Sequence, residues 1–475
     1  MNKAKPNIIF ICADQWRGDC LGFYKNQHPV MTPHLNQLAR EGRNYPSAYA
    51  DCPICMPQRL TMLTGRTGSS LGVISNFMSG PRPDIDEHTT ISAILGAAGY
   101  HTQAVGKMHF YPDRARWGFD NVVLHPNDYV NFLEENGYGG AYRGHGLGGN
   151  EVYPGVFPAP EKYYHTNWIV EESIRFLDRR DPDRPFFLSV VFEAPHSPFD
   201  PPAPYDRFYD NFSIPEPAVS EWSRSGDCPC EFISRTLSGN YDDLSPEAIL
   251  EARRKYYGQI TNIDYQLGRL FGALKTRGLD DNTTIVFTSD HGELLGDHGV
   301  FAKYCFLEGA ARVPLIIRPA VSTGLKLPDL NGPVMTADIV PTLLETAGIA
   351  CPEQADGRSL LNEDSWDRII CGETAGSAFA VDSEYKYIYY VNGGVEQLFK
   401  PENDPDDMHN LINQPGIVDA HIRLKTALIS YLGKYGSDKI DNGSPVRKDE
   451  AINEEWFRKN NPAACRGPMR FGSGY

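Results

Sequence analysis

Several short apolar runs in this chain end in polar residues, and this pattern limits the fold to few classes. Residues 7–13 read Asn-Ile-Ile-Phe-Ile-Cys-Ala, a nearly continuous apolar segment typical of a parallel strand covered on both faces. Residues 186–192 and the β-branched run at 283–288 have the same character. Helical patterns separate these runs, and such alternation predicts an α/β fold with a mostly parallel central sheet flanked by helices.

The helices between these runs have recognisable ends. Thr32, followed by a proline, predicts an N-cap, and Gly42 marks the end of that helix. A second helix is expected around residues 90–98, ahead of a strand near residues 101–105. The longest helix begins at Ser245 and carries an amphipathic stripe that we interpret as core packing. The stripe consists of Ile260, Ile263, Leu267, Leu270 and Leu274.

The pattern changes after residue 361. Short strand candidates at residues 368–371, 386–391 and 396–399 are separated by turn residues, which predicts an antiparallel meander. A helix expected at residues 418–435 would pack against this small sheet.

A chain of 475 residues is also long enough for two units. We therefore predict a large α/β domain at residues 1–361 and a smaller subdomain, with an antiparallel sheet and a helix, at residues 362–475.

The overall charge restricts the partners. The formal net charge is −16, which disfavours nucleic acid and anionic membranes and requires a local basic cluster for any anionic substrate. The chain has no apolar run near the ~20 residues that a transmembrane helix needs. It also begins without the pattern of a secretory signal, so we expect a cytoplasmic protein, or a periplasmic or secreted one if a signal was removed.

Candidate functional residues follow the predicted strands directly. Asp14 and Gln15 come after the first strand, His196 follows the strand at 186–192, and Asp290 with His291 follows the strand at 283–288. Open α/β sheets bind their ligands at the carboxyl ends of the strands. We therefore expect these side chains to meet in one site.

A motif at residues 52–66 indicates what that site does. Cys55, Pro57 and Arg59 form a Cys-x-Pro-x-Arg core that is followed by Leu-Thr-Gly. This run resembles the signature of the type I, formylglycine-dependent sulfatases of the alkaline phosphatase superfamily. The resemblance implies an alkaline-phosphatase-like fold. It also implies that a formylglycine-generating enzyme oxidises Cys55 to an aldehyde, whose hydrate attacks sulfate esters with one hydroxyl and later expels sulfate when the other is deprotonated.

The same resemblance implies a divalent metal. The implied ligands are Asp14, Gln15, Cys55, Asp290 and His291. Ca²⁺ is the first expectation. Gln15 stands where the family has a second acid, however, and His291 where it often has an amide, so Mg²⁺ and Mn²⁺ remain open.

Five cationic residues complete the predicted site. The resemblance implies that Arg59 holds the nucleophile, and that Lys107 and His109, in Gly-Lys-x-His, bind and deprotonate the aldehyde hydrate. His196 and Lys303 would contact sulfate and protonate or stabilise the leaving oxygen. The predicted catalytic set is Cys55, Arg59, Lys107, His109, His196 and Lys303.

Three other residues have weaker support. His298 is either close behind the site or structural, Arg312 is interpreted as structural, and Asn76 could reach the pocket.

The leading hypothesis is a sulfuric ester hydrolase acting on a sulfated carbohydrate, an oligosaccharide or a small organic sulfate. A phosphonate monoester or phosphodiester hydrolase of the same superfamily is the alternative, since it shares the Asp-Gln and Asp-His pattern; a non-catalytic binding protein is a third. Leaving-group contacts would come from loops at residues 138–149, 199–201 and 226–231, of which the first could equally be a plain surface loop. The oligomeric state stays open.

Overall fold

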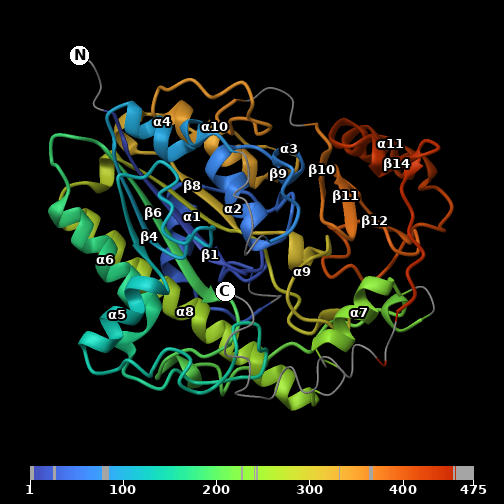
Figure 1. The fold of residues 1–475 in the computed structure, drawn as a ribbon, viewed down its shortest axis with the longest axis horizontal. Coiled ribbons are helices and arrows are strands. Elements are labelled where there is room, and N and C mark those ends of the chain that lie inside the picture. The colour runs from blue at the N-terminus through green and yellow to red at the C-terminus, as the bar shows by residue number, and fades with distance from the viewer. Residues whose placement is uncertain are drawn as a thin grey trace.

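The computed structural model describes residues 5–24, 28–76, 85–225, 228–239, 241, 244–330, 332–362, 367–452 and 455. At its centre is a seven-stranded sheet in the order β2-β8-β7-β1-β6-β4-β5 (Figure 1). The strands are β1 (Asn7–Asp14), β2 (Arg43–Asn44), β4 (His101–Gly106), β5 (Asn121–Leu124), β6 (Phe186–Pro195), β7 (Thr283–Ser289) and β8 (Leu315–Arg318). β7, β1, β6, β4 and β5 are parallel, whereas β8 and β2 are antiparallel to their neighbours. The predicted α/β class is confirmed.

Helices cover both faces of the sheet, which explains the continuous apolar runs. On one face, Ile9 and Ile11 of β1 pack in the core formed with α1 (Pro33–Glu41), α6 (His165–Arg179) and α8 (Pro246–Thr276). On the other, Ile8 and Phe10 pack with α2 (Cys55–Thr64), α4 (Ile91–Ala97) and α10 (Ile339–Thr346). Figure 1 shows α6 and α8 on the opposite side of the sheet from α2, α4 and α10.

Smaller elements connect these layers. The short helices are α3 (Gly68–Leu71), α5 (Asn127–Glu135), α7 (Cys230–Gly239) and α9 (Glu308–Ala311). β3 (Ala48–Tyr49) pairs in parallel with β9 (Val334–Met335). Within the described residues, no helix is both long and apolar enough to cross a bilayer.

The N-terminus of α1 is stabilised differently from the prediction. Thr32 is the N-cap residue, but its hydroxyl accepts a hydrogen bond from the Gly22 amide at 2.7 Å instead of capping the helix. The amides of His34 and Leu35 donate to the Asp264 carboxylate of α8 at 3.1 and 2.8 Å. The first turn is therefore fixed by a distant acid, a partner that local sequence does not reveal.

The C-terminal residues form a separate four-stranded antiparallel sheet, as predicted. Its order is β10 (Ile370–Glu373), β11 (Ser377–Val381), β12 (Lys386–Tyr390) and β13 (Glu396–Phe399), and α11 (Val418–Tyr435) packs on it. The sequence prediction missed β11, Ser-Ala-Phe-Ala-Val, whose alanines have low strand propensity. A short hairpin follows, β14 (Ile440–Asp441) with β15 (Ser444–Pro445).

The small sheet packs against the main domain. The rings of Phe306 and Phe379 stack with centroids 4.2 Å apart, and Lys386 of β12 forms a buried ion pair with Glu308 of α9 at 2.7 Å. The predicted boundary between residues 361 and 362 stays a prediction. Residues 363–366 beside it, and the end of the predicted subdomain at 456–475, lie outside the described residues.

Candidate active site

Two parallel strands bring the acidic residues together. β1 and β7 are paired neighbours, and Asp14 ends β1 while Asp290 and His291 follow β7 directly. Nε2 of His291 lies 3.6 Å from Oδ1 of Asp14 and 3.7 Å from Oδ1 of Asp290. All three side chains are fully buried. The predicted convergence at the carboxyl edge of the sheet is therefore present.

Cys55 enters this group from the start of α2. Its thiol Sγ lies 3.2 Å from Nε2 of His291. Burial opposes ionisation of the thiol, but the charges of Lys303 and His291 and the nearby rings of His109 and His196 lower the pKa of Cys55 well below its usual value. A cysteine at a helix N-terminus among cationic groups is reactive, unlike a cysteine in an apolar core.

The four residues Asp14, Cys55, Asp290 and His291 fit a divalent cation. Their ligand atoms all lie within 4.8 Å of one another. Oδ1 of Asp14 is buried and finds no hydrogen-bond partner among the described residues. Nδ1 of His291 lies 3.0 Å from the Gly292 carbonyl, so a proton held on that nitrogen would leave the Nε2 lone pair for a bound metal.

Gln15 differs from these four residues. Its left-handed backbone, with φ of 71°, places the amide beside the cluster. The side-chain oxygen accepts a hydrogen bond from Lys303 at 2.6 Å, and the side-chain nitrogen donates to Glu293. The backbone amide of Gln15 donates to Asp290 at 3.1 Å. A ligand role for Gln15 stays a prediction, because its oxygen already has a partner.

Two cations neutralise the acidic pair. Nη2 of Arg59 lies 3.0 Å from Oδ2 of Asp14 and 2.9 Å from Oδ2 of Asp290. Nζ of Lys107 lies 2.7 Å from the same Asp14 oxygen. Although burial opposes it, the charge of Lys107, supported by His196 and Arg59, holds the pKa of Asp14 far below its usual value. Asp14 is therefore ionised.

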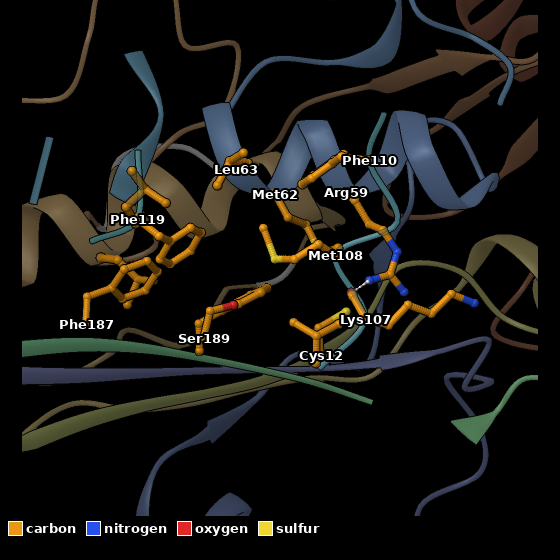
Figure 2. A pocket seen from close by; sticks show the side chains of 14 residues that line it. Cys12, Arg59, Met62, Leu63, Lys107, Met108, Phe110, Phe119, Phe187 and Ser189 are labelled. Atoms are coloured by element: carbon orange, nitrogen blue, oxygen red, sulfur yellow. Dashed lines mark hydrogen bonds between the residues drawn. The ribbon is translucent and has the colours of Figure 1, made fainter. Parts of the chain in front are cut away.

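A small, mostly apolar cavity lies next to these two cations. Arg59 extends from α2 and donates a hydrogen bond to the Lys107 carbonyl at 2.6 Å, the dashed line in Figure 2. The cavity of about 40 Å³ next to them lies between α2 and the sheet. Its labelled lining is otherwise mostly apolar and includes Met62, Leu63, Phe110, Phe119 and Phe187. Apart from Arg59 and Lys107, this lining offers mainly apolar contacts.

His196 and Lys303 form a second pair that lines the same cavity as Cys55. Nδ1 of His196 donates to the Ser197 carbonyl at 2.7 Å, and Nε2 accepts from Nζ of Lys303 at 2.9 Å. Burial and the charge of Lys303 lower the pKa of His196. Burial opposes protonation of Lys303 too, but Cys55 raises its pKa overall. The pair therefore holds a neutral imidazole and a charged ammonium.

A larger cavity of about 550 Å³ opens onto these groups. Five predicted residues line it, namely Cys55, Lys107, His109, His196 and Lys303. Asn76 also lines it and accepts a hydrogen bond from the Met56 amide at 3.0 Å. The volume is in the range of small-molecule sites.

The three predicted rim loops differ in their positions. Arg143 and Gly149, from the loop at 138–149, line the large cavity. Phe199 is instead a core residue, and Asp200 pairs with His145 at 2.8 Å. In the loop at 226–231, residues 226 and 227 lie outside the described residues, and the others do not line this cavity.

His298 and Arg312 have structural contacts. The ring of His298 hydrogen bonds to Ser220 and to the Asp406 carbonyl, both at 3.0 Å. Arg312 pairs with Glu308 at 2.8 Å. The structural interpretation of Arg312 agrees with this contact.

Sequence reasoning missed Glu193 and His125, which also line the large cavity. Glu193 lies 3.9 Å from Lys107 and 3.2 Å from Arg143. The signal for Glu193 was available, because it is the one charged residue in the otherwise buried apolar strand β6. His125 follows the short edge strand β5 and gave no comparable signal.

Comparison with known proteins agrees with this geometry. The model of the Sulfatase family matches residues 6–349. The chain belongs to the sulfatase family. The predicted sulfuric ester hydrolase class is thereby confirmed.

This sulfatase is 35% identical to an arylsulfatase of Clostridium perfringens over 482 residues, which covers 93% of this chain and 98% of the relative. An ulvan-active sulfatase of Formosa agariphila is 28% identical, with 99% and 88% of the two chains covered. Among solved structures, the phosphonate monoester hydrolase of Agrobacterium radiobacter superposes with a TM-score of 0.78 at 25% identity, covering 94% of this chain and all of that one.

Proposed function

We propose that this sulfatase hydrolyses the sulfate monoester of a carbohydrate or another small organic sulfate, with a formylglycine made from Cys55 as its nucleophile. The observation that carries the proposal is the position of Cys55. Its thiol stands among Asp14, Asp290 and His291, within 4.8 Å of their ligand atoms, and it also faces the large cavity. The sulfur marks where the oxygen atoms of a hydrated formylglycine would stand.

The acidic group would hold the metal. Asp14, Asp290, His291 and residue 55 are its proposed ligands, with Gln15 as a further candidate. We propose Ca²⁺ first, with Mg²⁺ or Mn²⁺ as alternatives, because the group mixes carboxylate oxygens with an imidazole. When bound, the cation would supply positive charge next to the sulfate oxygens and the nucleophile.

Arg59 and Lys107 position the nucleophile. Both cations bind Oδ2 of Asp14, and they are held in place by the Arg59 hydrogen bond to the Lys107 carbonyl. Lys107 also lines the large cavity, and such preorganised charge stabilises a transition state without reorganisation. His109 lines the cavity together with residue 55, and we assign to it the later removal of a proton from the nucleophile.

His196 and Lys303 serve the leaving oxygen. The Lys303 ammonium donates one hydrogen bond to His196 at 2.9 Å and one to Gln15 at 2.6 Å. Its third proton is left for a group in the cavity that Lys303 and residue 55 both line. Protonating or hydrogen bonding the leaving oxygen offsets the negative charge that develops there as the sulfur–oxygen bond breaks. This role matters most for alcohols that are poor leaving groups.

The phosphonate monoester hydrolase function is the second candidate. Gln15 and His291 at the metal group favour it, as does the structural likeness to such an enzyme. Lys107 and His109 next to residue 55 favour sulfate instead. A carbohydrate substrate is supported by the relative named for its action on ulvan and by the cavity lining, where Asn127, Asn150 and Tyr111 offer amides and a ring for sugar hydroxyls and faces.

The test compares two ester classes. The protein is produced together with a formylglycine-generating enzyme, its proposed maturation partner, and conversion of residue 55 is verified by peptide mass analysis. Initial rates are then measured on an aryl sulfate and on an aryl phosphonate monoester, with Cys55→Ala alongside. Faster sulfate release that depends on Cys55 supports the proposal. Preference for the phosphonate would replace it with the second candidate, and inactivity on both esters and on a panel of sulfated sugars would favour a binding protein.

A further inference from the structure

A second group of buried metal-binding side chains lies beside the catalytic one. His125, His165 and Glu193 place one ligand atom each within 4.8 Å of the others. His125 follows β5, His165 is the first residue of α6, and Glu193 is in β6. Three elements that are far apart in the sequence therefore bring these side chains together.

The two histidines have unsatisfied ring nitrogens. The His125 side chain is 0% exposed, and neither of its ring nitrogens finds a hydrogen-bond partner among the described residues. Nδ1 of His165 is buried in the same state. Burying a polar nitrogen without a partner is costly, and native proteins rarely leave one so. A bound ion would satisfy one nitrogen of each ring.

The spacing of Glu193 and His125 suits ligands of one ion. Nε2 of His125 lies 3.5 Å from Oε2 of Glu193. That is too long for a strong hydrogen bond, but it is close to the edge of a tetrahedron around zinc, roughly 3.3 Å for bonds of about 2.0 Å. The imidazole nitrogen of His165 lies within 4.8 Å of both, so all three ligand atoms gather around one point.

The two oxygens of Glu193 have different neighbours. Oε1 faces the cations, 3.2 Å from Arg143 and 3.9 Å from Lys107. Oε2 faces His125. The carboxylate can thus keep its ion pairs through one oxygen while the other binds a metal.

We propose that His125, His165 and Glu193 form a second metal site, which takes a divalent transition ion such as Zn²⁺ in the wall of the catalytic cavity. Two imidazoles and one carboxylate favour such ions over Ca²⁺ and Mg²⁺, which prefer oxygen. His125 and Glu193 line the cavity, so the open coordination position faces it. That position is available to water or to a hydroxyl or carboxylate of a ligand in the cavity.

Aromatic side chains surround His125. The rings of Tyr129 and Tyr142 pack on His125 with centroids 5.1 and 5.4 Å away. Arg143 neutralises part of the Glu193 charge through Oε1, so this site should bind more weakly than an isolated zinc site with the same ligands.

The experiment counts ions in the full chain. Protein stripped with a chelator is first saturated with Ca²⁺ and then titrated with Zn²⁺, and bound metal is measured by mass spectrometry. Co²⁺ replaces Zn²⁺ in parallel samples to give a visible spectrum. The variants are His125→Gln, His165→Gln and Asp290→Asn. His101→Gln is the matched control, because His101 is a partly buried histidine at the start of β4, whereas His125 lies near the end of that strand.

We expect the wild type to bind one more equivalent of Zn²⁺ than His125→Gln or His165→Gln. The Co²⁺ bands should be lost in both variants and kept in Asp290→Asn and His101→Gln. Equal Zn²⁺ stoichiometry in the wild type and in folded His125→Gln would overturn the proposal, as would bands that disappear only in Asp290→Asn.

X-ray absorption of the zinc-loaded wild type gives an answer even if the variants do not fold. Scattering from two imidazoles without sulfur is expected, whereas one imidazole with sulfur would place the ion at Cys55 and contradict a second site.

Discussion

The ammonium of Lys107 lies 2.7 Å from Oδ2 of Asp14, whereas Oδ1 of the same carboxylate is buried without a hydrogen-bond partner in the described chain. Oδ2 of Asp14 therefore pairs with the Lys107 ammonium, and Oδ1 is left for a metal ion. Arg59 also binds Oδ2, at 3.0 Å. This division lets positive side chains and a metal ion share one carboxylate without competing for the same oxygen.

Replacing Cys55 by alanine should abolish turnover and leave the fold intact. The residue is proposed to act through its oxidised side chain, and losing a nucleophile commonly lowers kcat by on the order of 10⁴-fold or more. Aryl sulfate release measures the rate, and circular dichroism with thermal melting measures the fold.

Cys52→Ala is the matched control, because Cys52 is also buried and lies three residues earlier. It should keep turnover and lose about 1 kcal/mol of stability from the removed sulfur. If Cys55→Ala retained more than a small fraction of the rate, the nucleophile assignment would be wrong.

Asp290→Asn should lose metal and activity together. Asp290 contributes one of two carboxylates to the group, and its Oδ1 also accepts from the Gln15 and His291 amides at 3.1 and 2.9 Å. Residues behind metal ligands already cost 10–100-fold in affinity when they are changed. We therefore expect a loss of at least about 100-fold for this ligand, read by metal titration of the unmodified protein.

The control for that titration is Asp51→Asn, a buried carboxyl whose side chain accepts from the Gly68 amide at 2.7 Å. It should bind metal as the wild type does. Unchanged metal affinity in Asp290→Asn would remove Asp290 from the proposed site.

The sequence predicted the central part of the fold and the gathering of most candidate residues at one edge of the sheet, for an identifiable reason. Asp14, His196 and Asp290 follow strands whose apolar runs are continuous, and parallel strands place their carboxyl ends at one edge of the sheet. Strand identity alone therefore brought these residues together.

Residues whose position depends on side-chain pairing could not be predicted in this way. Asp264 stabilises the start of α1 from α8, across 229 positions of sequence, and no local pattern links them. Likewise, no local pattern indicates that the side-chain oxygen of Gln15 accepts a hydrogen bond from Lys303 at 2.6 Å. These hydrogen bonds depend on which side chains the tertiary structure brings within reach of each other.

Lys303→Ala should slow the hydrolysis of esters with poor leaving groups more than that of esters with good ones. Lys303 donates to His196 beside the cavity, and it is proposed to supply the proton or hydrogen bond that the leaving oxygen needs. General acid catalysis is typically worth 10²–10⁴-fold. We expect a loss in that range for alkyl sulfates and a much smaller one for an activated aryl sulfate.

The measurement is kcat/KM across a series of aryl sulfates of increasing leaving-group pKa, with Lys303→Arg as the charge-conserving control. A steeper dependence in Lys303→Ala than in the wild type is expected. The same slope in both proteins would exclude a role at the leaving oxygen and favour sulfate binding alone.

The buried carboxyl of Asp51 should make stability fall as the pH rises. Burial raises the pKa of Asp51 to about 6 from an ordinary 3.8, so the folded state holds a proton that the unfolded chain loses between these values. Below pH 3.8 both states are protonated and the group has no effect; above pH 6 its full penalty applies. The penalty is about 3 kcal/mol, since one pKa unit corresponds to roughly 1.4 kcal/mol.

Asp51→Asn removes that ionisation and keeps an acceptor for the Gly68 amide, so the variant should become more stable than the wild type as the pH rises from 4 to 7. Denaturant unfolding at several pH values gives the difference directly, and the other titrating groups cancel in it. Burial raises the pKa of Asp264 to about 7, and the corresponding difference for Asp264→Asn should therefore level off about one pH unit higher. A difference that is constant with pH for Asp51→Asn would mean that its carboxyl is solvated or ionised in the folded protein, contrary to the burial found here.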